Sequence, residues 1–161
     1  MAEYPDLLQA IWADDSDRVK AILGSGADVD ILDPDGRTAL MDCAGRHDRF
    51  DYLRLLVDAG ANVNTSDPEG WTPLHFAAQA HLPRTIKYLL EHGAEADPQD
   101  SHGNTPLFRA VASSQGRGEV IIMLRTAGAD PINRNNHGKT PVDLAQMIGN
   151  FNVSQYFEDL K

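Results

Sequence analysis

The chain has 161 residues, a formal net charge of −10 and one cysteine. A single cysteine excludes an internal disulfide framework and a cysteine-based zinc cluster, and it suits a reducing compartment. No apolar run approaches the roughly eighteen residues of a membrane helix, and the first residues lack a secretion signal, so we expect a soluble, cytoplasmic protein.

The negative charge is concentrated near the N-terminus. Residues 1–35 hold nine acidic residues against Arg18 and Lys20, a local charge of −7. Such a field repels nucleic acid and anionic membranes, so we expect neither as a partner, and it attracts a basic protein. The same charge serves solubility, and the sequence leaves both interpretations open.

Residues 5–32 form the first predicted unit. Its apolar residues recur at the spacing of two amphipathic helices: Leu7, Leu8 and Ile11, then Val19, Ile22 and Leu23. Trp12 lies on the first of these helices, and we interpret it as core of a terminal unit rather than as a binding residue. The surrounding acidic residues predict a solvated cap.

Four related segments follow at a nearly constant period. They read Asp33-Pro-Asp-Gly-Arg-Thr-Ala-Leu, Asp67-Pro-Glu-Gly-Trp-Thr-Pro-Leu, Asp100-Ser-His-Gly-Asn-Thr-Pro-Leu and Asn135-Asn-His-Gly-Lys-Thr-Pro-Val. Their glycines fall 34, 33 and 35 residues apart: Gly36, Gly70, Gly103 and Gly138. A second glycine series precedes these segments, each glycine followed by alanine: Gly26, Gly60, Gly93 and Gly128. Two series in step indicate a structural repeat.

The repeated residue types predict one local structure. A threonine suits the N-cap of a helix and a proline its first turn, so helices are expected to start after Thr38, Thr72, Thr105 and Thr140. The first glycine series permits a tight turn, and the second permits the left-handed conformation that ends a helix. Each unit is therefore predicted to be turn, helix, loop and helix.

These motifs resemble the ankyrin repeat over nearly the whole chain. The resemblance implies an all-α solenoid of about five helix-turn-helix units with finger-like β-turn loops. We expect a single domain with units at about 5–32, 33–66, 67–99, 100–134 and 135–161, the first and last being caps. The resemblance also implies a protein-binding function, and we expect a monomer when the partner is absent.

Two departures from the repeat and the capping helix at its end carry further expectations. The loop at 113–119 is extended and polar, so it is either a mobile segment beside a binding surface or a tolerated insertion, which we favour. Arg125 takes a position where the family usually has leucine, so its stem should pack while its guanidinium reaches solvent or a carboxylate. The final helix should present Phe151, Val153, Tyr156 and Phe157 on its apolar face.

The family histidine of the helix start is present only as His75. Met41, Phe108 and Asp143 occupy the corresponding positions. The resemblance implies that this histidine ties neighbouring fingers by hydrogen bonds, so we expect fewer such ties elsewhere.

No residue pattern indicates catalysis, a cofactor or a metal. The six histidines lack the spacing that places two ligands on one helical face. Cys43 stands where the repeat has a small buried alanine, and no phosphate-binding glycine loop is present. We therefore expect no enzyme activity and no bound cofactor.

Positions that the fold of the repeat does not require are the candidates for binding a partner. On the finger tips they are Asp35, Arg37, Glu69, Trp71, His102, Asn104, His137 and Lys139. On the inner helices they are Asp42, Arg46, Phe76, Gln79 and Arg109. Trp71 is predicted to be an exposed hot spot, the alternative being packing across a neighbouring finger. Arg37, Arg46 and Arg109 could form bidentate contacts with carboxylates of the partner.

A short acidic chain of this style resembles small bacterial ankyrin proteins, some of which are immunity proteins for secreted toxins. The resemblance implies an inhibitor that covers a toxin domain with its concave face, with the acidic end facing a basic nuclease. The alternative is a cytosolic adaptor or regulatory subunit that holds an enzyme or transcription factor without inhibiting it.

Overall fold

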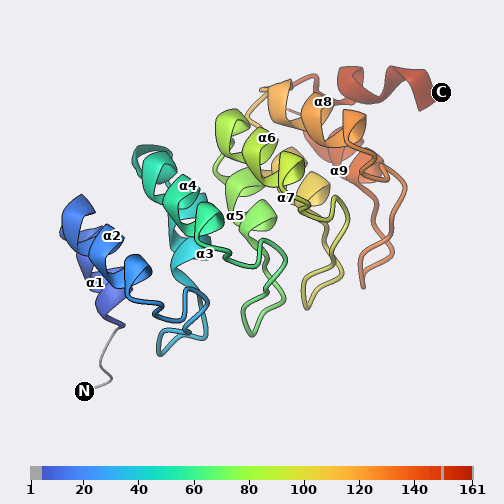
Figure 1. Cartoon of the computed structure of the whole chain (residues 1–161). Coiled ribbons are helices and arrows are strands. Elements are labelled where there is room, and N and C mark those ends of the chain that lie inside the picture. Colours follow the sequence, from blue (N-terminus) through green and yellow to red (C-terminus); the bar gives the residue numbers. More distant parts are fainter. Residues whose placement is uncertain (1–4, 150, 161) are drawn as a thin grey trace.

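The computed structural model describes residues 5–149 and 151–160, and the helices in this part of the chain form five consecutive pairs (Figure 1). Residues 1–4, part of the stretch in which no secretion signal was predicted, lie outside the described residues, as do residues 150 and 161 of the last predicted unit. The pairs are α1 (Asp6–Trp12) and α2 (Ser16–Gly24); α3 (Ala39–Ala44) with the 3-10 turn η1 (His47–Arg49) and α4 (Phe50–Asp58); α5 (Pro73–Gln79) and α6 (Pro83–Glu91); α7 (Pro106–Ala112) and α8 (Glu119–Thr126); α9 (Pro141–Met147) and the 3-10 helix η2 (Val153–Leu160).

The pairs stack side by side, and the connections between them project as fingers from one side of the stack (Figure 1). Along the stack α3 packs against α5, α5 against α7 and α7 against α9, while α6 packs against α8. The described residues contain no β-strand. The expected all-α solenoid with finger-like loops is therefore confirmed.

A continuous ribbon of buried apolar side chains runs through the stack. Leu40, Leu74 and Leu107 occupy equivalent positions of α3, α5 and α7, and all three are fully buried. Cys43 is fully buried among them, and burial raises the pKa of its thiol. A thiol held neutral in the core behaves as a small apolar side chain, as the sequence predicted.

The helix starts follow the predicted capping. Side chains of Thr38, Thr105 and Thr140 accept a hydrogen bond from the backbone N–H three residues later. At the starts of α5 and α9 the cap is reciprocal, between Thr72 and His75 and between Thr140 and Asp143. These caps satisfy N–H groups that the first turn of a helix leaves unpaired, so they fix where each inner helix begins.

Each finger turns on the same hydrogen-bonding device. In the second finger Oδ1 of Asp67 accepts the backbone N–H groups of Glu69 and Trp71, at 3.0 and 2.9 Å. The glycine between them, Gly70, has a φ of +78°, a conformation that favours glycine. The same turn recurs around three further residues, Asp33, Asp100 and Asn135.

The structure corrects the description of the last unit. Its second helix is a 3-10 helix interrupted at Phe157, where φ is −132°, rather than a regular α-helix. Val153 and Phe157 are buried as expected, whereas Phe151 is 45% exposed.

The extended loop before α8 and this terminal helix pack together. The hydroxyl of Tyr156 donates to the carbonyl of Gly116 at 2.8 Å. Arg125 donates to Asp159 and to the carbonyl of Tyr156. The sequence predicted that its guanidinium reaches either solvent or a carboxylate, and it reaches a carboxylate. The loop therefore supports the C-terminal cap.

Within the described ranges, every helix is too short or too polar to cross a lipid bilayer.

Candidate binding surface

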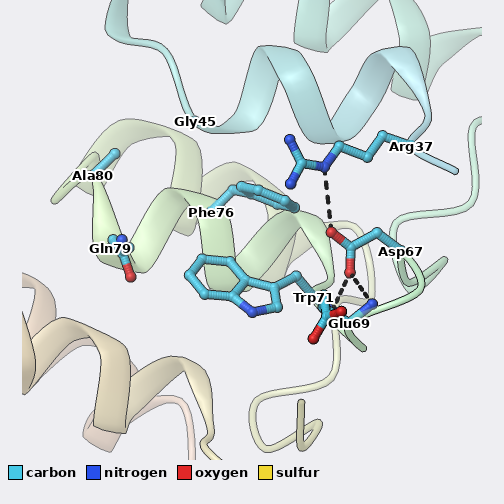
Figure 2. A pocket seen from close by; sticks show the side chains of 8 residues that line it. All are labelled: Arg37, Gly45, Asp67, Glu69, Trp71, Phe76, Gln79 and Ala80. Carbon is cyan, nitrogen blue, oxygen red and sulfur yellow. Dashed lines mark hydrogen bonds and ion pairs between the residues drawn. The ribbon is translucent and has the colours of Figure 1, made fainter. Parts of the chain in front are cut away.

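One hollow lies where the second finger meets α3 and α5. This central groove has a volume of about 500 Å³. Figure 2 shows the residues that line it: Arg37, Gly45, Asp67, Glu69, Trp71, Phe76, Gln79 and Ala80. Five of them were predicted to bind a partner: Arg37, Glu69, Trp71, Phe76 and Gln79.

Two aromatic rings form the apolar part of the central groove. The centroids of Trp71 and Phe76 lie 5.1 Å apart, with the ring planes inclined at 51°. The guanidinium of Arg37 lies 5.3 Å from the Phe76 centroid, and that of Arg109 lies 4.3 Å from the Trp71 ring. The groove therefore presents an aromatic pair flanked by two cations, a composition typical of protein interfaces.

Trp71 is half-buried, so its indole is less exposed than its predicted place on a finger tip suggested. Its ring lies against Phe76 and His75 of its own unit and beneath Arg109 of the next. This combines both alternatives of the sequence analysis, because the ring packs across to the neighbouring unit and still lines the groove.

The arginines of the central groove are held by carboxylates. Arg37 donates from Nε to Oδ2 of Asp67 at 3.3 Å (Figure 2). Arg109 donates from Nε to Oδ2 of Asp100 at 3.0 Å and makes a second bond to the same oxygen. Arg109 is consequently committed within the chain, which corrects its prediction as a fork for a partner carboxylate.

The pairing with Arg109 affects the ionisation of the Asp100 carboxylate. Burial opposes its ionisation, but hydrogen bonds from Arg109 and from the backbone N–H groups of Asn104 and His102 outweigh burial and lower its pKa. Asp100 therefore stays ionised and anchors both its finger and the arginine over Trp71.

A second hollow, the N-terminal groove, lies between α1 and the first finger. Its volume is about 260 Å³. It is lined by Trp12, Asp33, Asp35, Arg37, Met41, Asp42, Gly45, Arg46 and Phe76. Because Arg37, Gly45 and Phe76 line both grooves, the two form one continuous surface over the first three units.

Trp12 belongs to this surface, which corrects its prediction as core. The side chain is 41% exposed, and its Nε1 donates to Oδ2 of Asp42 at 3.2 Å. The sequence contained a signal for this position. Trp12 follows Leu7 by five residues, as Gln79 follows Leu74. In an alignment of the first unit with the third, Trp12 therefore takes the position of Gln79, a predicted binding residue.

The remaining predicted residues do not all line a groove. Asn104 is buried, and its Oδ1 accepts from Nδ2 of Asn135 at 2.8 Å, so it joins two fingers. His102, His137 and Lys139 are exposed on the last two fingers, but neither groove includes them. Asp35, Asp42 and Arg46 line the N-terminal groove, where Arg46 Nε lies 3.7 Å from the Asp42 carboxylate.

The chemistry of this surface is that of recognition. In the described part of the chain, no group of three or more histidine, cysteine or acidic side chains is placed to hold a metal ion. The grooves instead bring aromatic rings and charged groups together. Such groups are suited to contact the side chains of another protein.

Two protein-family models match the chain. One, described as Ankyrin repeats (3 copies), matches residues 7–100, and another, described as Ankyrin repeats (many copies), matches residues 81–125. A search among curated proteins gave no match.

Proposed function

Because the chain belongs to the ankyrin-repeat family, whose repeats form non-catalytic protein-binding modules, we propose that it binds one protein through its two joined grooves. The observation that carries the proposal is the continuity of this surface. Phe76 and Arg37 line both hollows, so a partner that fills one meets the other. The exposed edges of Trp12, Trp71 and Phe76 supply apolar contacts, and the surrounding charges supply orientation.

The finer proposal is an inhibitor of the immunity type, which neutralises a toxin-like effector by covering it. The N-terminal groove is bordered by the most acidic part of the chain, because residues 1–35 carry a charge of −7. Such a field accelerates association with a basic protein and opposes association with an acidic one. A basic effector domain is therefore the partner that this surface favours.

One observation favours the alternative, a cytosolic adaptor or regulatory subunit that scaffolds an enzyme or transcription factor. The outer helices α6 and α8 carry a separate hollow of about 320 Å³. Its lining is largely apolar: Lys87, Leu90, Glu91, Ile122, Met123, Thr126 and Ala127. A scaffold needs two surfaces, and this hollow lies on helices that the finger grooves do not use.

Affinity capture followed by titration distinguishes the two functions. The tagged chain is used to isolate a partner, whose affinity and activity are then measured with and without the chain. An inhibitor requires a Kd of about a nanomolar or tighter and loss of the partner's activity at equimolar chain. A Kd of about a micromolar with activity retained would contradict inhibition and support the adaptor.

A further inference from the structure

Each aromatic ring of the central groove has a guanidinium of the chain itself beside it. The Arg37 guanidinium lies 5.3 Å from the Phe76 centroid, and the Arg109 guanidinium lies 4.3 Å from the Trp71 ring. Each arginine is also bound to the carboxylate of a finger. A partner cation placed on these rings would approach a charge of the same sign, so the rings do not favour a cationic occupant.

The rings offer apolar surface to a partner. Trp71 and Phe76 are both half-buried, so part of each ring is accessible from the groove that they line. Gly45 and Ala80 line the same groove without adding a polar side chain. An apolar side chain suits this surface, because its contact removes ring surface from water without desolvating a charge.

The Glu69 carboxylate supplies the net charge of the central groove. Arg37 and Asp67, the two other charged residues of its lining, form an ion pair with each other at 3.3 Å. Glu69 is exposed, and its Oε2 accepts the hydroxyl of Ser101 at 3.0 Å. Within the described residues no lysine or arginine lies within ion-pair distance of Glu69. A hydroxyl leaves the negative charge uncompensated, so a basic group of the partner is favoured here.

An amide lies on the other side of the rings. Figure 2 shows Gln79 and Glu69 on opposite sides of the Trp71 indole. The Gln79 side chain is exposed, and it has no hydrogen-bond partner in the part of the chain that the structure describes. An amide both donates and accepts, so Gln79 can pair with a peptide group of a bound segment.

We infer that the central groove binds a segment of the protein partner that places an apolar side chain against Trp71 and Phe76 and a basic side chain beside Glu69. This inference rests on the proposed function, and it assigns to Glu69 the selection of the basic neighbour. An acidic side chain is disfavoured, because Asp67 already neutralises Arg37 and Glu69 repels a second carboxylate.

Glu69→Gln removes the charge and keeps the contact between fingers. The carbonyl of Glu69 accepts the N–H of Ser101 at 2.8 Å, a backbone bond that the substitution leaves in place. The side-chain oxygen of glutamine can still accept the Ser101 hydroxyl. Glu95→Gln is the matched control, since Glu95 is exposed, lines neither groove and loses the same charge.

The probe is the peptide acetyl-Lys-Leu-Lys-amide, titrated into the ¹⁵N-labelled chain and followed by NMR. A lysine on each side of the leucine allows either direction of the bound segment. In three comparison peptides, alanine replaces the leucine, Nε-acetyl-lysine replaces both lysines, or glutamate replaces both lysines. We expect the probe to shift the indole N–H of Trp71 and the side-chain amide of Gln79, and to bind at least about fivefold more tightly than each comparison peptide.

The two variants separate Glu69 from the overall charge of the chain. Glu69→Gln should reduce the preference for lysine over acetyl-lysine at least about threefold, whereas Glu95→Gln should change it less than about 1.5-fold. An equal reduction in both variants, or none in Glu69→Gln, would overturn the inference. So would equal binding of the alanine peptide, tighter binding of the glutamate peptide, or an absent response of Trp71 and Gln79.

The captured partner distinguishes failure of this inference from failure of the proposed function. If the peptides show no selectivity but the partner loses affinity when Phe76 is changed to alanine, the proposed function stands and only the inference fails. If the partner's affinity is indifferent to Phe76→Ala, the proposed function itself fails.

Discussion

At the scale of single residues, His75 explains how the start of α5 is joined to the next finger. Its Nδ1 accepts the backbone N–H of Thr72 at 3.1 Å, so the ring proton sits on Nε2 and is donated to the carbonyl of Asn104 at 3.0 Å. The ring is fully buried. Only the neutral imidazole can form both bonds. The protonated ring carries a hydrogen on Nδ1, which then cannot accept the Thr72 N–H.

The stability of the chain should therefore depend on pH in the range where histidine titrates. Burial lowers the pKa of His75, and burial together with the charge of Arg117 lowers that of His81. Their contribution is present above the unfolded pKa of about 6.5 and is lost as the pH falls below it through the lowered folded-state pKa. We expect the free energy of unfolding in urea to be smaller at about pH 5.5 than at about pH 7.5.

His75→Gln should reduce this pH dependence, since glutamine does not titrate and retains an acceptor for the Thr72 N–H. His47→Gln is the control, because His47 is exposed in η1. A pH dependence unchanged by His75→Gln, or reduced equally by His47→Gln, would contradict the role assigned to His75.

At the scale of elements, neighbouring fingers are joined by backbone hydrogen bonds. The N–H of Ser101 donates to the carbonyl of Glu69 at 2.8 Å, and that of Asn136 donates to His102 at 2.9 Å. A Cβ placed on Gly70 would lie 2.9 Å from the Cα of Asp100. The sequence predicted fewer histidine ties away from His75, and backbone groups join these fingers where the histidine is replaced.

Gly70→Ala and Gly138→Ala separate the strain of the turn from the contact between fingers. Both glycines have a positive φ, +78° and +71°, but only Gly70 faces backbone within 4 Å. Alanine should cost about 1 kcal/mol at Gly138 from conformation alone. At Gly70 we expect a loss larger by about 1–3 kcal/mol in the free energy of unfolding, since the next finger must move. Equal losses in urea denaturation would show that the fingers are independent.

The loop before α8 and the terminal helix η2 give a second prediction at this scale. A Cβ on Gly118 would overlap the Tyr156 ring, whereas one on Gly24, in α2, meets nothing within 4 Å. Gly118→Ala should detach η2 and lower the free energy of unfolding by about 1–3 kcal/mol. Gly24→Ala should be neutral or slightly stabilising. Hydrogen exchange of the η2 amides measures the detachment, and unchanged protection in Gly118→Ala would refute this packing.

The sequence predicted what local chemistry decides and failed where neighbours decide. Thr105 and Pro106 mark a helix start by their own properties, so the inner helices could be located from the repeat. Asn104 and Arg109 looked available because their partners, Asn135 and Asp100, are fixed only by the stacking of units and the turn of a finger. Trp12 was misjudged for the same reason, since the groove beside it needs both α1 and the first finger.

At the scale of the whole molecule, the binding surface and the core occupy different parts of each unit. The fully buried side chains lie between stacked helices, whereas the two grooves lie where fingers meet α1, α3 and α5. A repeat protein adds the contributions of its units and interfaces, so its recognition residues can differ from unit to unit while the stack persists. The first three units carry both grooves in this chain.

The affinity of the captured partner for four forms of the chain tests this surface most directly. The forms are the native chain, Phe76→Ala, Gln79→Arg and Ile122→Ala. Phe76 lines both grooves, and Gln79 is exposed in the central groove, where arginine adds bulk without disturbing the core. Ile122 is 52% exposed on α8, outside both grooves. Ile122→Ala is therefore the control, because it removes apolar surface away from the proposed binding site.

We predict that Phe76→Ala and Gln79→Arg each raise the Kd at least about tenfold, while Ile122→Ala changes it less than about twofold, each variant melting as a folded protein. The reverse result, in which Ile122→Ala weakens binding and both groove variants retain native affinity, would contradict the assignment and place the partner on the outer helices.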